Sequence, residues 1–233
     1  MSVETHRVLM GACGWKHQAW LNDFYSEDLP EDWQLGFYSN EFPVVYVSAA
    51  DWLDMANLDV EDLSEWKEDV SESFRFILEI SSEVLEHESR FLTAIEKVKS
   101  LDEFCLGVVF LLSPNICNDI ELFNQRLESA QTITPVCVDK QGIVISKEIT
   151  DVLLNTNVSE VWDGKSDGKE NYQRGSLAIS RISGDKLDMG GLRKVIEHCL
   201  DVSNEERVSV LCLDGEPPSL ELLRNADIIL NLL

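Results

Sequence analysis

Apolar runs of strand length alternate with segments of helical spacing along the whole 233-residue chain, and this alternation limits the folds open to it. The residues between most of the runs show helical stripes, for example Leu92, Ile95 and Val98. Repeated strand and helix units favour parallel strands joined by right-handed crossovers. We predict eight strands, at Val8–Met10, Val44–Val47, Phe74–Ile80, Phe104–Leu112, Ile133–Val138, Val158–Trp162, Leu177–Ile182 and Val208–Leu213.

Eight such units close naturally into a barrel, so the predicted class is α/β, a TIM-like (βα)8 barrel, with residues 1–233 forming a single domain. A doubly wound open sheet is the alternative. The segment 163–176 has three glycines among polar residues and no apolar stripe. We expect an exposed loop there in place of a helix, so the barrel should be distorted or incomplete near strands six and seven. Ser219 is the expected N-cap of the last helix.

The chain is strongly acidic, with 43 Asp and Glu against 19 Lys and Arg and a formal net charge of −24. Such a surface repels phosphate backbones, so nucleic acid is not an expected partner. The segment 51–72 is the most acidic, with nine carboxylates and Lys67 as its one basic residue. This pattern is typical of a solvated helix face, and a docking surface for a basic protein is the alternative.

Several classes of protein are not expected from this composition. No apolar stretch approaches the roughly 18 residues needed to cross a bilayer, and the first residues lack signal-peptide features, so we expect a cytoplasmic protein. The six cysteines include no C-x-x-C pair and should be reduced and mostly buried. The four histidines are scattered, and Gly11 and Gly14 lack the rest of a dinucleotide fingerprint. We therefore predict neither metal nor cofactor.

The most specific motif follows the first predicted strand. It reads GACGWKHQAW from Gly11 to Trp20, with Phe24-Tyr25 and Leu29-Pro30 after it. This stretch resembles the opening of the YecE-like family, domain-of-unknown-function family 72. The resemblance covers nearly the whole chain and implies a TIM-like barrel. Weaker similarities continue in order at Phe74–Phe76, Leu106–Gly107, Pro114, Ser180–Gly184 and Asn225–Ala226.

The polar positions of that family are largely substituted here, whereas Arg181 is retained. Compared with the family pattern, the changed positions are Tyr46, Ser48, Glu79, Gln141, Ser183 and Asp214. The resemblance therefore implies a binding or accessory protein, non-catalytic or weakly active, with an altered pocket. The alternative is a hydrolase of a phosphorylated or sugar-like metabolite, so enzymatic activity remains an open question.

Barrel enzymes place their chemistry at the carboxyl ends of the strands. At those ends we expect a ligand-binding set of Trp15, Lys16, Ser48, Glu79, Asp139, Arg181, Ser183 and Asp214.

Within this set Arg181 has the clearest role, because a buried guanidinium needs a countercharge. Either an internal ion pair with Asp139 or Glu79 or a small anionic ligand would supply it. Glu79, Asp139, Asp163 and Asp214 could together bind Mg²⁺ or Ca²⁺ or act as acid and base. Carboxylates at loop positions are nevertheless expected by chance in so acidic a chain.

Two further side chains near the first strand have structural interpretations. Trp20 should pack under the first helix, since aromatic side chains beside a barrel strand commonly do so. His17, next to Lys16, is interpreted as loop surface without a catalytic role.

Overall fold

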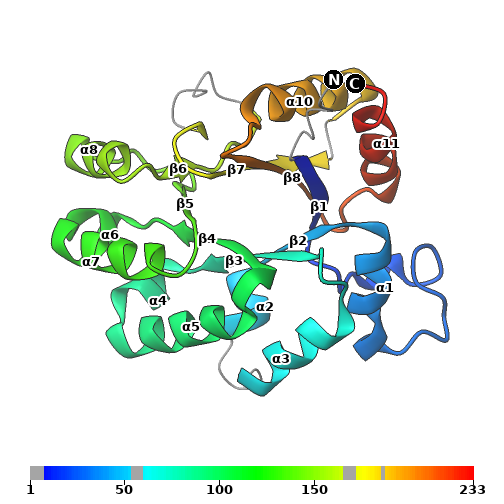
Figure 1. Ribbon diagram of the computed structural model, residues 1–233, viewed down its shortest axis with the longest axis horizontal. Helices are drawn as coiled ribbons and strands as arrows, with labels where there is room; N and C mark the ends of the chain where they lie inside the picture. Colours follow the sequence, from blue (N-terminus) through cyan, green and yellow to red (C-terminus); the bar gives the residue numbers. More distant parts are fainter. Residues whose placement is uncertain (1–7, 54–59, 165–171, 185–186) are drawn as a thin grey trace.

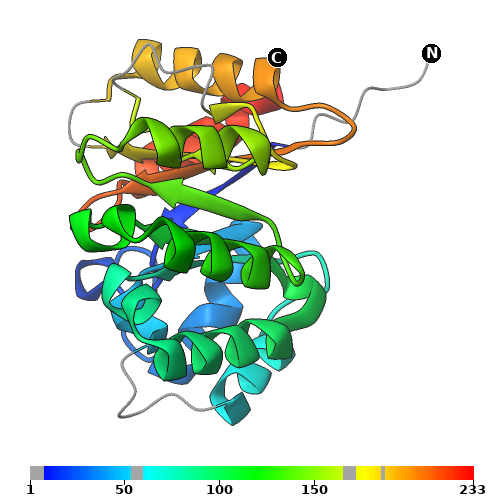
Figure 2. The same cartoon turned by 90° about the vertical axis from the view of Figure 1, so that its left-hand side faces the viewer.

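The computed structural model describes residues 8–53, 60–164, 172–184 and 187–233, which form a ring of strands surrounded by helices (Figures 1 and 2). The strands are β1 (Val8–Cys13), β2 (Val44–Val47), β3 (Arg75–Ile80), β4 (Cys105–Leu111), β5 (Val136–Asp139), β6 (Ser159–Glu160), β7 (Leu177–Ser183) and β8 (Val208–Asp214). Each of the eight lies within or overlaps a predicted run. The TIM-like barrel is therefore confirmed.

The strand order is β6-β5-β4-β3-β2-β1-β8-β7, and every neighbouring pair is parallel. Across the remaining seam, Trp162, two residues after β6, forms an isolated parallel bridge with Ser180 of β7. There the Trp162 N–H donates to the Ile179 carbonyl and the Arg181 N–H donates to the Trp162 carbonyl, both at 2.9 Å. The barrel is thus nearly closed, with an unsealed seam where the sequence predicted a distortion.

The longer helices follow the strands: α1 (Gln34–Glu41), α3 (Val60–Asp69), α5 (Glu88–Leu101), α7 (Ile120–Gln131), α8 (Lys147–Asn155), α10 (Met189–Val202) and, after the last strand, α11 (Leu220–Leu230). The shorter turns are η1 (Gln18–Trp20), η2 (Glu31–Trp33), η3 (Asp102–Phe104), α2 (Ala49–Leu53), α4 (Ser82–Glu86) and α6 (Pro114–Asn118). Ser219 Oγ accepts the Leu222 N–H at 3.3 Å, which confirms the predicted N-cap of α11.

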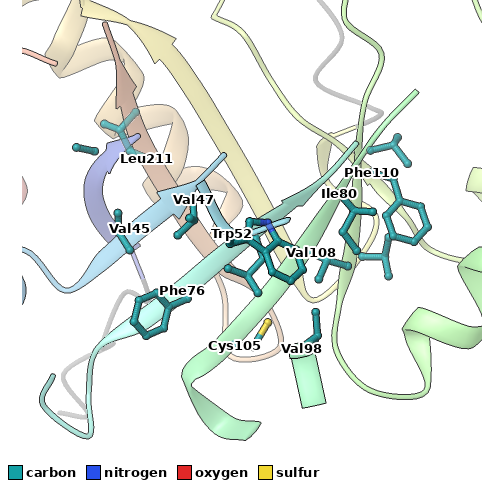
Figure 3. Packing of buried hydrophobic residues seen from close by; sticks show 14 of the residues in the cluster. Val45, Val47, Trp52, Phe76, Ile80, Val98, Cys105, Val108, Phe110 and Leu211 are labelled. Atoms are coloured by element: carbon teal, nitrogen blue, oxygen red, sulfur yellow. The ribbon is translucent and has the colours of Figure 1, made fainter. Parts of the chain in front are cut away.

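Side chains alternate between the two faces of each strand, as the pleat requires. One set fills the barrel interior and includes Val44, Ile77, Val109, Ile179 and Val210. The other set packs outward against the helices. Figure 3 shows this outer core, where strand residues of β2, β3 and β4 meet Trp52 of α2 and Val98 of α5.

The first loop is held in place by an aromatic cluster. Trp20 is 1% exposed, stacks on Tyr38 at 6.3 Å and donates its indole N–H to the Pro218 carbonyl at 3.1 Å, so its predicted packing role is confirmed. The Tyr38 hydroxyl accepts the Ala12 N–H at 2.8 Å and donates to the Val44 carbonyl at 2.9 Å. These bonds tie β1 to β2 just before β1 reaches the barrel mouth.

Two details differ from the sequence predictions. The buried stripe of α5 runs through Phe91, Ile95 and Val98, whereas Leu92 is half exposed, because positions 91, 95 and 98 share one helical face. In the segment 163–176, residues 165–171 lie outside the described residues. Tyr172 within it is buried, whereas the whole segment was expected to be exposed, and its hydroxyl hydrogen bonds to Ser180 Oγ at 2.6 Å.

The cysteines and the acidic segment agree with prediction where they are described. All six cysteines are free thiols, and five are buried. In the segment 51–72, residues 54–59 lie outside the described residues, while Glu65, Glu68 and Asp69 are exposed on α3. Among the helices that the structure describes, none has the length and apolar character needed to span a membrane.

Candidate functional site at the barrel mouth

A pocket of about 920 Å³ opens where the carboxyl ends of β1, β2, β3, β7 and β8 converge. Loops after these strands and the helix α3 complete its wall. The residues that line it are Cys13, Gly14, Trp15, Lys16, His17, Asp32, Tyr46, Ser48, Ala50, Asp51, Glu65, Trp66, Glu79, Gln141, Arg181, Asp214, Gly215 and Glu216.

Strand alternation explains which polar side chains enter the mouth. Arg181 lies two residues after Ile179, an interior residue of β7, and therefore shares its inward direction. Glu79 follows interior Ile77 on β3 in the same way, and Asp139 follows interior Cys137 on β5. The charged residues thus form the last layer of the barrel interior, above its apolar filling.

The Arg181 guanidinium is surrounded by three carboxylates. Its Nη1 lies 3.3 Å from Glu79 Oε2 and 3.3 Å from Asp139 Oδ2, and its Nε lies 3.3 Å from Asp214 Oδ2. The predicted pairing of Arg181 with Asp139 or Glu79 is confirmed, and it involves both residues together with Asp214. One positive charge faces three negative charges, so the guanidinium has no charge left unmatched for a further anion.

Glu79 is held by several donors. The Tyr46 hydroxyl donates to Glu79 Oε2 at 2.8 Å, and the Ala49 N–H donates to Glu79 Oε1 at 3.1 Å. The Trp52 indole N–H donates to the Glu79 backbone carbonyl at 2.7 Å. Arg181 also lies over the Tyr46 ring, 5.5 Å from its centroid. Glu79 is consequently an oriented, hydrogen-bonded carboxylate with little rotational freedom.

The environment shifts three groups in the mouth. Burial raises the pKa of the Cys13 thiol well above its ordinary value, and the nearby Cys212 and Asp214 add to this. Burial, followed by the Glu79 charge, likewise raises the pKa of Tyr46. Burial alone would lower the pKa of Arg181, but Tyr46 and Asp139 outweigh it and leave that pKa above its usual value. All three groups therefore keep their protons at neutral pH.

Asp139 and its neighbours form a second charged group beside the first. Asp139 Oδ1 accepts the Gln141 N–H at 2.8 Å, which fixes the turn after β5. Lys140 Nζ pairs with Glu160 Oε2 at 2.6 Å on the next strand. Lys140 is therefore also neutralised within the barrel wall.

The outer part of the pocket is formed by two indoles and their surroundings. Trp15 is 3% exposed and meets Trp66 edge to face, with ring centroids 5.0 Å apart. The Trp15 indole N–H has no hydrogen-bond acceptor among the residues that the structure describes. Lys16 Nζ lies 5.8 Å from the Trp15 ring centroid and 3.4 Å from Glu31 Oε1.

Most of the residues predicted for the site come together, and some do not. Ser48 lines the pocket and donates to Asp51 Oδ2 at 2.7 Å. Asp139 does not line the pocket but forms an ion pair with Arg181, which does. Ser183 and Asp163 are exposed and lie outside the pocket lining. No group of three or more His, Cys, Asp or Glu suited to a metal ion occurs in the described part of the chain.

Sequence reasoning did not include several lining residues in the ligand-binding set. Tyr46 was noted as a substitution only, although strand alternation puts it on the same face as interior Val44. Asp32 comes from η2, Glu65 from α3 and Glu216 from the loop after β8, and the sequence does not show that these three elements face one pocket. Only the assembled barrel brings these carboxylates to one mouth.

Comparison with known proteins gives a family and a fold. A family model described as "Protein of unknown function DUF72" matches residues 9–140. A solved DUF72 family protein from Thermotoga maritima is similar at a TM-score of 0.70 and 13% identity, covering 97% of this chain and 99% of that one. A phosphoribosyl anthranilate isomerase, solved with a reduced deoxyribulose phosphate ligand, aligns at a TM-score of 0.50 and 14% identity over 98% and 100% of the two chains. No curated protein matches the sequence.

Proposed function

Since this chain belongs to the DUF72 family of proteins of unknown function, we propose that it is a small-molecule binding or accessory protein without efficient hydrolytic activity. The observation that supports this most is the Arg181 cluster. Its guanidinium is shared by three carboxylates at 3.3 Å each, so the ionisable groups at the centre of the mouth are engaged with one another.

Nucleophilic catalysis has little support in this arrangement. A catalytic cysteine needs a low pKa and a base beside its sulfur, whereas burial raises the pKa of Cys13. The imidazole of His17 places Nε2 2.9 Å from the Cys13 backbone carbonyl and meets the Trp20 ring edge to face. His17 therefore interacts with the backbone, and its predicted lack of a catalytic role is retained in the proposal.

The hydrolase alternative requires groups that the mouth does not present in suitable form. Glycoside hydrolysis needs one carboxylic acid to carry a proton, but Glu79 accepts hydrogen bonds from a hydroxyl, a backbone N–H and a guanidinium. Barrels that bind phosphate commonly do so with the loops after strands seven and eight. Here Asp214 at the end of β8 and Glu216 in the loop after it line the pocket, and both repel a phosphate.

We also propose the cytoplasm as the compartment of this protein. The support is that all six cysteines are free thiols, five of them within the core, as is usual where thiols are kept reduced.

The test is a turnover screen of the purified protein against phosphate-ester and glycoside panels, with and without Mg²⁺ or Mn²⁺. We expect no turnover above the level of a heat-denatured sample. Any hit should be repeated with Asp139→Asn, which keeps the size of the side chain and removes its charge. Turnover that is lost in Asp139→Asn while the circular dichroism spectrum stays unchanged would refute the proposal in favour of an enzyme.

A further inference from the structure

We propose that the barrel-mouth pocket binds an organic cation that also carries hydroxyl groups, such as an amino sugar; this inference rests on the proposed binding function. It replaces the anionic ligand at Arg181 that the sequence allowed as the alternative to an internal ion pair. Three independent features of the pocket support it: its charge, the arrangement of its own cations, and an indole N–H without an acceptor.

The charge of the pocket lining favours a cation. Its carboxylates are Asp32, Asp51, Glu65, Glu79, Asp214 and Glu216, against the two cations Lys16 and Arg181. Both cations are already paired, Lys16 with Glu31 and Arg181 with three carboxylates. A concave wall of low dielectric concentrates such an excess of one sign and attracts the opposite charge.

The carboxylates at the rim are available to a ligand. Within the described residues, Asp32, Glu65 and Glu216 form no ion pair, and Glu65 is exposed on α3. Asp51 and Glu65 belong to the acidic segment 51–72. Since both side chains line the pocket, we assign this part of the segment to ligand binding in place of the basic protein partner considered from the sequence.

The pocket's own cations show how a positive group is recognised here. Lys16 Nζ lies 5.8 Å from the Trp15 ring centroid with Glu31 at 3.4 Å. Arg181 lies 5.5 Å from the Tyr46 ring centroid with Glu79 at 3.3 Å. Each cation thus has an aromatic face on one side and a carboxylate on another. Trp66 and Glu65 also line the pocket, so its wall contains a further aromatic ring and a further carboxylate.

The hydroxyl part of the ligand is suggested by Trp15. This side chain lines the pocket and is 3% exposed, yet its indole N–H has no acceptor among the described residues. An unpaired buried donor costs free energy, and a ligand oxygen that reached this N–H would recover that cost. A simple polyamine has only donors when protonated, whereas an amino sugar has both an ammonium and hydroxyl oxygens. The volume of about 920 Å³ accommodates more than one sugar ring.

The test compares ligands that share a sugar skeleton and differ in charge. Isothermal titration calorimetry at low salt would use the disaccharide of glucosamine, its neutral N-acetylated form, and inorganic phosphate. We expect the amine form to bind at least tenfold more tightly than the neutral form, phosphate not to bind, and the affinity to fall as NaCl is added. Equal affinity for the two disaccharides, no binding of the amine form, or binding of phosphate would each overturn the inference.

Two double variants test whether the amine binds in this pocket. The double variant Asp32→Asn with Glu65→Gln removes two exposed rim charges without changing side-chain size, and we expect about a tenfold loss of affinity for the amine. The matched control, Glu121→Gln with Glu128→Gln, removes two exposed charges on α7, outside the pocket, and should leave the affinity unchanged. Equal loss in both variants would indicate a general charge effect and refute the site.

The binding and turnover experiments can refute the ligand class and the non-catalytic proposal independently of each other. If no ligand of this series binds and the panel shows no turnover, the ligand class is wrong and the non-catalytic proposal stands. If the amine disaccharide binds and is also cleaved, the ligand class stands and the non-catalytic proposal is wrong.

Discussion

Replacing Arg181 by alanine tests the charged layer of the barrel mouth directly. The substitution leaves Glu79 and Asp139, whose side chains are only 10% and 17% exposed, without their shared countercharge. Removing one partner of a buried ion pair costs about 3 to 5 kcal/mol. The Arg181 side chain is 27% exposed and that of Asp214 is 42% exposed, so water screens part of the interaction and the lower end, about 3 kcal/mol, is expected.

Urea denaturation followed by circular dichroism measures this loss at pH 7. A loss of about 3 kcal/mol in a chain of this size corresponds to a fall in Tm of about 6 to 12 °C. The matched control is Arg193→Ala, which breaks an exposed i,i+4 pair with Glu197 at 2.8 Å and should cost less than about 0.5 kcal/mol.

Removing one of the carboxylates as well gives a second, independent check. Adding Glu79→Gln to Arg181→Ala should recover part of the lost stability at pH 7, because one of the unpaired charges is gone.

A deficit below about 1 kcal/mol, or one that Glu79→Gln does not reduce, would refute this account. Either result would mean that the three carboxylates are well solvated without the guanidinium. The ion cluster would then not stabilise the mouth.

Three further predictions concern neighbouring residues. Tyr46→Phe removes the hydroxyl that donates to Glu79 at 2.8 Å and should cost about 1 to 2 kcal/mol in urea denaturation; no change would show that the bond is not needed. Gly11→Ala puts a Cβ 1.8 Å from the facing β2 carbonyl oxygen and should lower the stability by more than about 4 kcal/mol. Gly142→Ala, where the space is open but φ is +80°, should lower it by about 1 kcal/mol, and similar Tm values for the two variants would contradict this. Because the pKa of Cys13 is raised, less of this thiol is ionised at pH 8 than in an ordinary cysteine. Its alkylation, measured by mass spectrometry, should therefore be slower than that of free cysteine and should accelerate only at higher pH. Rapid labelling of Cys13 at pH 8 would contradict the raised pKa.

The architecture could be predicted from the sequence because its signals are local. Strand runs such as Val44–Val47 and Leu177–Ile182 show as short apolar segments, and the Ser219 cap shows as one residue before a helical stripe. The weak β6–β7 seam was also indicated, by the polar, glycine-containing segment that follows the sixth strand. These features depend on residues within one turn or one strand of each other.

The inward direction of Arg181 and Asp139 could also be predicted, since each ends a strand whose alternation is visible in the sequence. What could not be predicted was that Asp214 joins the same guanidinium, or that Tyr46 orients Glu79. Those contacts join residues from different strands, and strand closure and register decide which side chains meet.

The sequence by itself determined the alternating elements, the barrel class and the family, because periodicity and motif order act over short stretches of chain. The tertiary structure alone decided the chemical character of the pocket. Its sign of charge is a sum over side chains that are far apart in the sequence, from Asp32 in the first loop to Glu216 after β8. Electrostatic potential depends on distances in space and on burial. An acidic chain therefore forms a strongly negative pocket only where folding brings its carboxylates around one cavity.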